Sequence, residues 1–186
     1  RLSGQRWDDA LPEDFVTKFL DWSAELPTLG EVTIPRSYFE RSPSSVELHM
    51  FGDSSQEVFS AVAFLRGEVP TEDGKSTELA FVFGKARVAP MKALTIPKLE
   101  LLAALLAARL KDEIHRALTL KIDRTFMWTD STTVLQWLHS LEKQPVFVAN
   151  RIAEISELTI ADEWHHVPSA DNPADAGTRG LSAKAL

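Results

Sequence analysis

Four acidic residues occupy positions where acids are unusual, and together they could bind divalent metal ions. Asp53 follows a β-type run in MFGDSS, Glu100 lies one turn into an apolar helical stretch in KLELLAALL, Asp130 follows FMWT, and Asp175 lies in NPADAG. Carboxylates gathered at one place raise one another's pKa unless cations neutralise them. Hard oxygen ligands favour Mg²⁺ or Mn²⁺. Two such ions about 4 Å apart can clamp the attacking and leaving oxygens of a phosphodiester displacement.

Each acid also has an ordinary structural explanation. Asp53 could form a turn and Asp130 could cap a helix. Glu100 and Asp175 could be acids in the first turn of a helix, where the helix dipole favours them. Any one of the four, taken alone, is better explained in this way, so the metal hypothesis depends on their convergence in the fold.

The elements that must position these acids are read from hydrophobic periodicity. Three successive strands, expected in VELHMF, VFSAVAFL and ELAFVFGK, suggest an antiparallel meander, with the polar stretch Arg66–Thr77 as a surface loop. A long buried helix is predicted at Pro97–Leu118. The remaining expected elements are a strand at Arg124–Thr129, a helix after Asp130, a helix at Val146–Leu158, a short strand near Ala161–Val167 and a segment led by Pro173. In α/β sheets of this kind, ligand sites lie beyond the carboxyl ends of strands.

The region before the first strand has a different character. Leu11–Leu26 carries Phe15, Phe19 and Trp22 on one face of an amphipathic helix. Pro, Ser and Gly accumulate after it, so we predict a linker or boundary near Ser42–Ser45. We therefore expect a helical extension at residues 1–45 and a main domain at residues 46–186. Because the sequence begins with Arg1, it is interpreted as a piece of a longer polypeptide.

Composition narrows the function classes. The 186 residues are 44% hydrophobic, carry a formal net charge of -7 and have a pI of about 5.2, which argues against broad nonspecific attraction to nucleic acid. The absence of cysteine excludes thiolate zinc sites, disulfides and cysteine nucleophiles. No apolar stretch approaches a membrane span and no signal-peptide pattern is present, so a soluble, intracellular protein is expected.

One local exception to the acidic balance precedes Glu100. The stretch from Gly84 to Leu99 contains no acid and holds four cations, Lys85, Arg87, Lys92 and Lys98. Such a basic ribbon could follow a phosphate backbone, although an ordinary solvated loop explains it equally well.

The order of these motifs resembles the ribonuclease H domain of retroelement reverse transcriptases. More narrowly, RVAPMKALTIPKLELLAALLAARL, FMWTDSTTVLQWL, FVANRIAEI and HHVPSADNPADAGTRG resemble the Pao/BEL class of LTR retrotransposons, over about Val46 to Gly180. The resemblance implies an α/β, ribonuclease H-like fold: a mixed five-stranded sheet, three antiparallel strands followed by parallel additions, flanked by helices. It also implies hydrolysis of the RNA strand of an RNA·DNA hybrid during reverse transcription.

The resemblance further implies a role for individual residues. Asp53, Glu100, Asp130 and Asp175 would bind two Mg²⁺ ions, for which Mn²⁺ would substitute, with Asp53 shared between them. A histidine that assists product departure would be His166, with His165 as the alternative. The hybrid would be held through its backbones and 2′-hydroxyls. The expected contacts are Ser54, Lys85, Arg87, Lys98, Thr132, Asn150, Arg151 and Arg179.

The same resemblance implies partners and leaves two alternatives. The domain would be linked to a polymerase upstream and an integrase downstream, in the cytoplasm within retroelement particles, with no membrane partner. One alternative is a domesticated, inactive binding module of the same fold. The other is an integrase or transposase, although those enzymes use a late Glu where this chain has NPAD.

Overall fold

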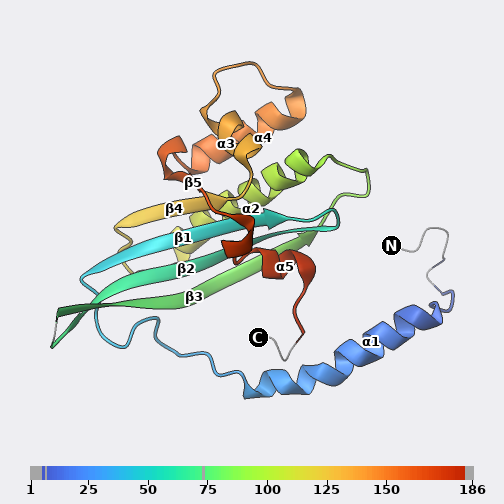
Figure 1. Ribbon diagram of the computed structural model, residues 1–186, viewed down its shortest axis with the longest axis horizontal. Helices are drawn as coiled ribbons and strands as arrows, with labels where there is room; N and C mark the ends of the chain where they lie inside the picture. The colour runs from blue at the N-terminus through green and yellow to red at the C-terminus, as the bar shows by residue number, and fades with distance from the viewer. Residues whose placement is uncertain (1–5, 7, 73, 183–186) are drawn as a thin grey trace. The chain divides into compact units, whose positions relative to one another are not determined.

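The computed structural model describes residues 6, 8–72 and 74–182 of the chain (Figure 1). It divides into two compact units, one of residues 36–180 and one of residues 1–35 with 181–186. In the second unit, α1 (Glu13–Glu25) is followed by the 3₁₀ helix η1 (Leu26–Glu31). The amphipathic helix predicted at Leu11–Leu26 is therefore confirmed, and no residue of α1 is buried.

The unit of residues 36–180 is built on one mixed sheet with the strand order β3-β2-β1-β4-β5. Its strands are β1 (Ser45–Ser54), β2 (Val58–Thr71), β3 (Gly74–Val88), β4 (Arg124–Thr129) and β5 (Trp164–His166). The first three strands are antiparallel, whereas β4 is parallel to β1 and β5 is parallel to β4. The predicted mixed five-stranded sheet is confirmed.

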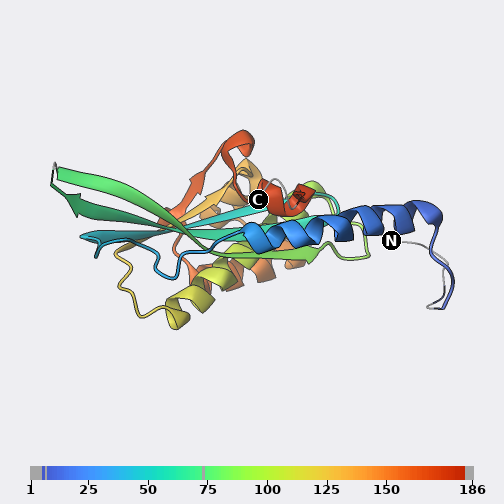
Figure 2. The ribbon, with the colours of Figure 1, turned by 90° about the horizontal axis from the view of Figure 1, so that it is seen from below.

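Helices cover both faces of this sheet. They are α2 (Ile96–Ala117), α3 (Thr132–His139), α4 (Val146–Leu158) and α5 (Asp175–Arg179), with 3₁₀ turns η2 (Ala161–Glu163) and η3 (Ser169–Asp171). The long helix α2 lies on one face and the short α5 on the other (Figure 2). α2 lies close to β1, since a Cβ on Gly52 would come within 3.1 Å of the Ala103 carbonyl oxygen.

The hydrophobic core forms between the sheet and α2. Leu48 and Met50 of β1, Leu65 of β2 and Leu101 of α2 are fully buried within it. Their burial follows the two periods of the sequence, every second residue along a strand and every third or fourth along the helix. Among the described residues, no helix is both long enough and apolar enough to span a membrane.

The prediction of a surface loop at Arg66–Thr77 is wrong. β2 and β3 pair through this stretch as far as Thr71 and Gly74, so the connection is a tight hairpin (Figure 1). Glycine at position 67 made this stretch look like a loop. It is required there because a Cβ would lie 2.5 Å from the buried ring of Phe39. The hairpin turn uses Gly74 at a φ of 135°, a conformation that favours glycine.

Candidate active site

Two neighbouring parallel strands bring the first pair of acids together. Gly52 of β1 lies opposite Thr129 of β4, so Asp53 and Asp130 each follow one of two paired residues. Asp175 is the first residue of α5, on the sheet face toward which Asp53 points. The carboxyl ends of β1 and β4 therefore display acids at one edge of the sheet, where α/β folds place their ligand sites.

The charges of these acids affect one another. Asp53 is 8% exposed, and its burial raises the pKa of its carboxyl group. The negative charges of Asp130 and Asp175 raise that pKa further, while hydrogen bonds from the Thr178 hydroxyl and the Ser54 amide oppose the rise. Asp53, Asp130 and Asp175 thus form one electrostatic cluster, whose charge repulsion a bound cation would relieve.

The fourth acid reaches the cluster from α2. Glu100 accepts a hydrogen bond at 2.6 Å from the hydroxyl of Ser131, the residue that directly follows Asp130. Of the four acids that the sequence singled out, the structure therefore clusters Asp53, Asp130 and Asp175, and it connects Glu100 of α2 to the residue after Asp130.

Each acid is held by a donor from the protein itself. Thr178 donates to Asp53, Ser131 to Glu100 and Ser169 to Asp130, each at 2.6 Å. Arg179 forms an ion pair with Asp175 at 2.8 Å. In the part of the chain that the structure describes, no three His, Asp or Glu side chains are gathered so as to hold a metal ion. The donor set nonetheless fits Mg²⁺ in its chemistry, since it consists of carboxylate oxygens at one end of the sheet.

The cap of α3 is Ser131 rather than Asp130. The Ser131 hydroxyl accepts a hydrogen bond from the Val134 amide at 3.1 Å and begins the helix. Helix capping therefore does not account for Asp130, whose carboxylate instead accepts from Ser169. The sequence alone assigns no role to Ser131, Ser169 or Thr178. The one available signal was that Ser131 and Thr178 are hydroxyl residues close in sequence to Asp130 and Asp175.

The two candidate histidines have different surroundings. His165 lies against the rings of Phe126 and Trp128, with ring centroids 5.7 and 5.2 Å away. His166 is exposed at the end of β5, opposite Thr129, the residue before Asp130. His166 is the one free to meet a ligand in solvent.

Comparison with known proteins identifies the family. The model of the Pao retrotransposon-like RNaseH-like domain matches residues 2–131. The chain belongs to this family. The match includes Asp53, Glu100 and Asp130 and ends before Asp175. No curated protein matches the sequence.

Several solved structures similar to this RNase H-like domain are RNase H proteins. RNase H1 from the archaeon Halobacterium salinarum NRC-1 is 18% identical, with a TM-score of 0.43, over 72% of this chain and 93% of that one. The N-terminal RNase H domain of a Mycobacterium tuberculosis protein is 16% identical, with a TM-score of 0.46, over 76% and 94%. LC11-RNase H1, solved with an RNA/DNA hybrid, is 15% identical, with a TM-score of 0.47, over 76% and 99%. Scores this low add nothing to the topology and family match.

Two predicted nucleic-acid contacts of the RNase H-like domain meet at one aromatic ring. The Lys98 ammonium, in the first turn of α2, lies 5.4 Å from the ring centroid of Phe147, and the Arg151 guanidinium lies 3.5 Å from it. Arg151 also donates to the Phe147 carbonyl at 2.9 Å. Two cations are thus fixed between α4 and the turn of α2 that carries Glu100. The sequence reasoning had given Phe147 no role.

The other predicted contacts are more dispersed. Lys85 is held by Glu113 at 3.0 Å, so its charge is balanced within the domain. Ser54 ends β1 with a buried hydroxyl for which no hydrogen-bond partner is found among the described residues. The predicted contacts with exposed side chains are Arg87, Thr132, Asn150 and Arg179. Lys92 of the basic ribbon is exposed as well.

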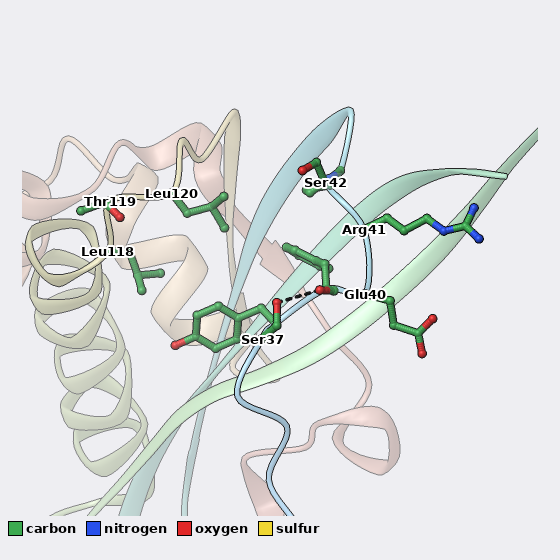
Figure 3. Close-up of a pocket in the computed structure, with 10 residues that line it drawn as sticks. Ser37, Glu40, Arg41, Ser42, Leu118, Thr119 and Leu120 are labelled. Atoms are coloured by element: carbon green, nitrogen blue, oxygen red, sulfur yellow. Dashed lines mark hydrogen bonds between the residues drawn. The ribbon is translucent and has the colours of Figure 1, made fainter.

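A separate cavity of about 410 Å³ lies at the other end of α2 (Figure 3). The segment before β1 supplies one wall, in which the Ser37 hydroxyl donates to the Phe39 carbonyl at 2.7 Å. Leu118 follows Glu100 by 18 residues, or about 27 Å of helix rise, so this cavity is remote from the acids. Its lining residues are Ser37, Tyr38, Phe39, Glu40, Arg41, Ser42, Pro43, Leu118, Thr119 and Leu120.

Proposed function

We propose that this RNase H-like domain hydrolyses the RNA strand of RNA·DNA hybrids during reverse transcription of a retroelement. The observation that supports the proposal is the electrostatic cluster of Asp53, Asp130 and Asp175 at one edge of the sheet, to which Glu100 is linked through Ser131. Membership of the Pao family supports the substrate and the retroelement setting. Residues 1–45 would then connect the domain to an upstream polymerase, with an integrase downstream, within cytoplasmic particles.

The four carboxylates would hold two Mg²⁺ ions, or Mn²⁺ in their place. Bound there, the ions would activate water and stabilise the departing 3′ oxygen. The role of the chain is to orient the carboxylates. Thr178 does so for Asp53 and Ser131 for Glu100, because each hydroxyl donates to a carboxylate oxygen. Ser169 and Arg179 would release Asp130 and Asp175 as the ions bind.

The substrate would lie across the acids with its phosphates on the cationic groups. Lys98 and Arg151 are the best placed of these groups, because the ring of Phe147 holds both of them beside the first turn of α2, directly before Glu100 in the chain. Ser54, Lys85, Arg87, Thr132, Asn150 and Arg179 would add weaker contacts, and Lys85 would first have to leave Glu113. The exposed His166 would assist departure of the product.

The decisive experiment compares duplexes. Purified protein is incubated with labelled RNA·DNA, RNA·RNA and DNA·DNA duplexes in Mg²⁺, Mn²⁺ or EDTA, beside the variant Asp130→Asn. The proposal predicts metal-dependent loss of the RNA strand from the hybrid alone, with 5′-phosphate and 3′-hydroxyl ends. Asp130→Asn should abolish this cutting while circular dichroism shows an intact fold.

The outcomes separate the alternatives. Cutting of DNA·DNA duplexes would favour an integrase-type or transposase-type nuclease. Binding of the hybrid without any cutting, in both metals and at high protein concentration, would favour an inactive binding module. Unchanged cutting by Asp130→Asn would remove Asp130 from the mechanism.

A further inference from the structure

The last acid of the site stands on a helix too short to position it unaided. α5 comprises only the five residues Asp175–Arg179, and a helix of this length is not stable by itself in water. The location of Asp175 must therefore be set by whatever docks the segment onto the sheet. Among the described residues, three side-chain hydrogen bonds made by buried residues join residues 172–178 to the sheet.

Two of the three hydrogen bonds hold the chain just before α5. The Asn172 side-chain amide donates to the Gly52 carbonyl at 3.0 Å, and the Ser60 hydroxyl donates to the Ala174 carbonyl at 2.6 Å. Asn172 is 4% exposed and Ser60 is 3% exposed. The helix lies so close to β2 that a Cβ on Gly177 would come within 2.9 Å of the Ser60 Cβ. These contacts fix the position of the segment on the sheet.

The third hydrogen bond joins α5 directly to another acid. Thr178 is 9% exposed, and its hydroxyl donates to Oδ2 of Asp53 at 2.6 Å and lies 3.0 Å from the Asp175 carbonyl oxygen. Thr178 thus touches Asp53 from the same helix turn that carries Asp175. It opposes the separation of two like charges that would otherwise repel.

We propose that Thr178 is a positioning residue, which sets the spacing between Asp53 and Asp175 by holding α5 against the Asp53 carboxylate. The proposal rests on the hydrolytic function proposed above. A misplacement of about 1 Å in such a site can cost about 100-fold in rate. Thr178 need not touch the substrate, because it acts through the two acids.

The test uses Thr178→Val, which keeps the side-chain shape and removes the hydroxyl, and Thr178→Ser, which restores the hydroxyl. Thr159→Val is the matched control: Thr159 is also a buried threonine, but its hydroxyl donates to Ile155 and accepts from Trp164, away from the acids. For each variant, kcat and KM on the hybrid are measured, with the Mg²⁺ dissociation constant by calorimetry and urea unfolding.

Thr178→Val should lower kcat by at least about tenfold, change KM less than about twofold and weaken Mg²⁺ binding. Thr178→Ser should recover kcat to within about threefold. Thr159→Val should lower stability and leave both kcat and Mg²⁺ binding unchanged. If Thr178→Val does not fold, Ser60→Ala replaces it, since it loosens the same helix without touching an acid and should lower kcat and Mg²⁺ affinity in the same direction.

The failures are distinguishable. If the wild type cuts the hybrid and a folded Thr178→Val cuts it equally well with equal Mg²⁺ affinity, the positioning role is overturned and the proposed function stands. Failure of Thr178→Ser to recover kcat would also overturn it. A wild type that binds Mg²⁺ but leaves the hybrid intact would overturn the proposed function, and this inference with it.

Discussion

Ser131 links Glu100 to the start of α3. Its hydroxyl donates to Oε2 of Glu100 at 2.6 Å and accepts from the Val134 amide at 3.1 Å. One buried side chain therefore both caps a helix and orients an acid contributed by another helix, 31 residues earlier in the chain. The capping of α3 and the geometry of the acids are coupled at this atom.

Ser131→Ala should therefore impair both stability and cutting. Loss of an N-cap costs about 1 kcal/mol of unfolding free energy, and Glu100 loses the donor that holds it. Ser131→Asn is the matched variant, because asparagine caps well and its amide can still donate to Glu100. Urea unfolding and hybrid cleavage should show Asn recovering most of both losses. Full activity in Ser131→Ala would contradict the orienting role.

Asp53→Asn should stabilise the fold at neutral pH. Because the pKa of Asp53 is raised above its ordinary value of 3.8, chiefly by burial, its charged form is less favourable in the folded chain than in the unfolded chain. This penalty is present at pH 7 and disappears as the pH falls below 3.8. We expect a higher Tm for Asp53→Asn than for the wild type at pH 7 and no difference near pH 3.

Glu47→Gln provides a control of opposite sign. Burial opposes its charge, but hydrogen bonds from His49, Arg66 and Arg124 outweigh burial and lower its pKa. Its charge therefore stabilises the fold above its ordinary pKa of 4.5, and this stability is lost as the pH falls through the lowered value. Thermal unfolding at pH 7 should show a loss for Glu47→Gln where Asp53→Asn shows a gain. Mg²⁺ should raise the Tm of the wild type but not that of Asp53→Asn.

His49 should make the fold sensitive to mild acid. Trp128 donates its indole N–H to His49 Nδ1 at 3.1 Å, so Nδ1 must be unprotonated, and the other ring nitrogen lies 3.3 Å from Glu47. Burial, the largest cause, lowers the pKa of His49, and the nearby charges of Arg66 and Arg124 lower it further against the opposing effect of Glu47.

The sign of the effect follows from the unfolded chain, in which His49 takes up a proton as the pH falls below about 6.5. The folded chain resists that proton, so the free energy of unfolding should decrease between pH 7 and pH 5. His49→Phe should flatten this decrease, and His139→Gln, at an exposed position, should not. Urea unfolding at several pH values measures the slopes. Equal slopes for wild type and His49→Phe would show that the ring is not responsible.

Periodicity predicted the elements best where one face is buried. The helix Val146–Leu158 was predicted at the observed residues because its apolar side chains recur with the helical period, and the strand Arg124–Thr129 because it contains a short continuous apolar run. The stretch Arg66–Thr77 was misread because its paired strands contain Gly67, whose space is filled by Phe39 from a distant segment. No local pattern encodes that contact.

In the site, too, features that depend on local sequence could be predicted and those that depend on distant contacts could not. Asp53 and Asp130 could be located from sequence, because Asp53 lies at the end of one strand, Asp130 directly follows another, and strand ends share an edge. The donors that hold the acids could not be located in this way: Thr178 lies 125 residues from Asp53 and Ser169 lies 39 residues from Asp130. A hydrogen bond between side chains so far apart depends on the final packing of α5 and η3, which no local spacing reports.

Lys98→Ala should weaken hybrid binding and reduce its dependence on salt. Lys98 lies over the Phe147 ring with Arg151 and two residues before Glu100 in the chain, where a phosphate of the substrate would be neutralised. Lys121→Ala is the matched control: it removes the same charge from an exposed lysine paired with Asp123, at the start of β4 rather than at its acidic end.

Binding of a labelled hybrid is measured by fluorescence anisotropy at several salt concentrations, in an Asp130→Asn background that prevents cutting. Because each phosphate contact contributes roughly one to the slope of log affinity against log salt, Lys98→Ala should flatten that slope by roughly one and weaken binding by about three- to tenfold at low salt. Lys121→Ala should keep the wild-type slope, since it stands away from the acids. Equal slopes for the wild type and Lys98→Ala would show that Lys98 does not contact a phosphate. Equal losses of affinity in both lysine variants would indicate an effect of net charge alone.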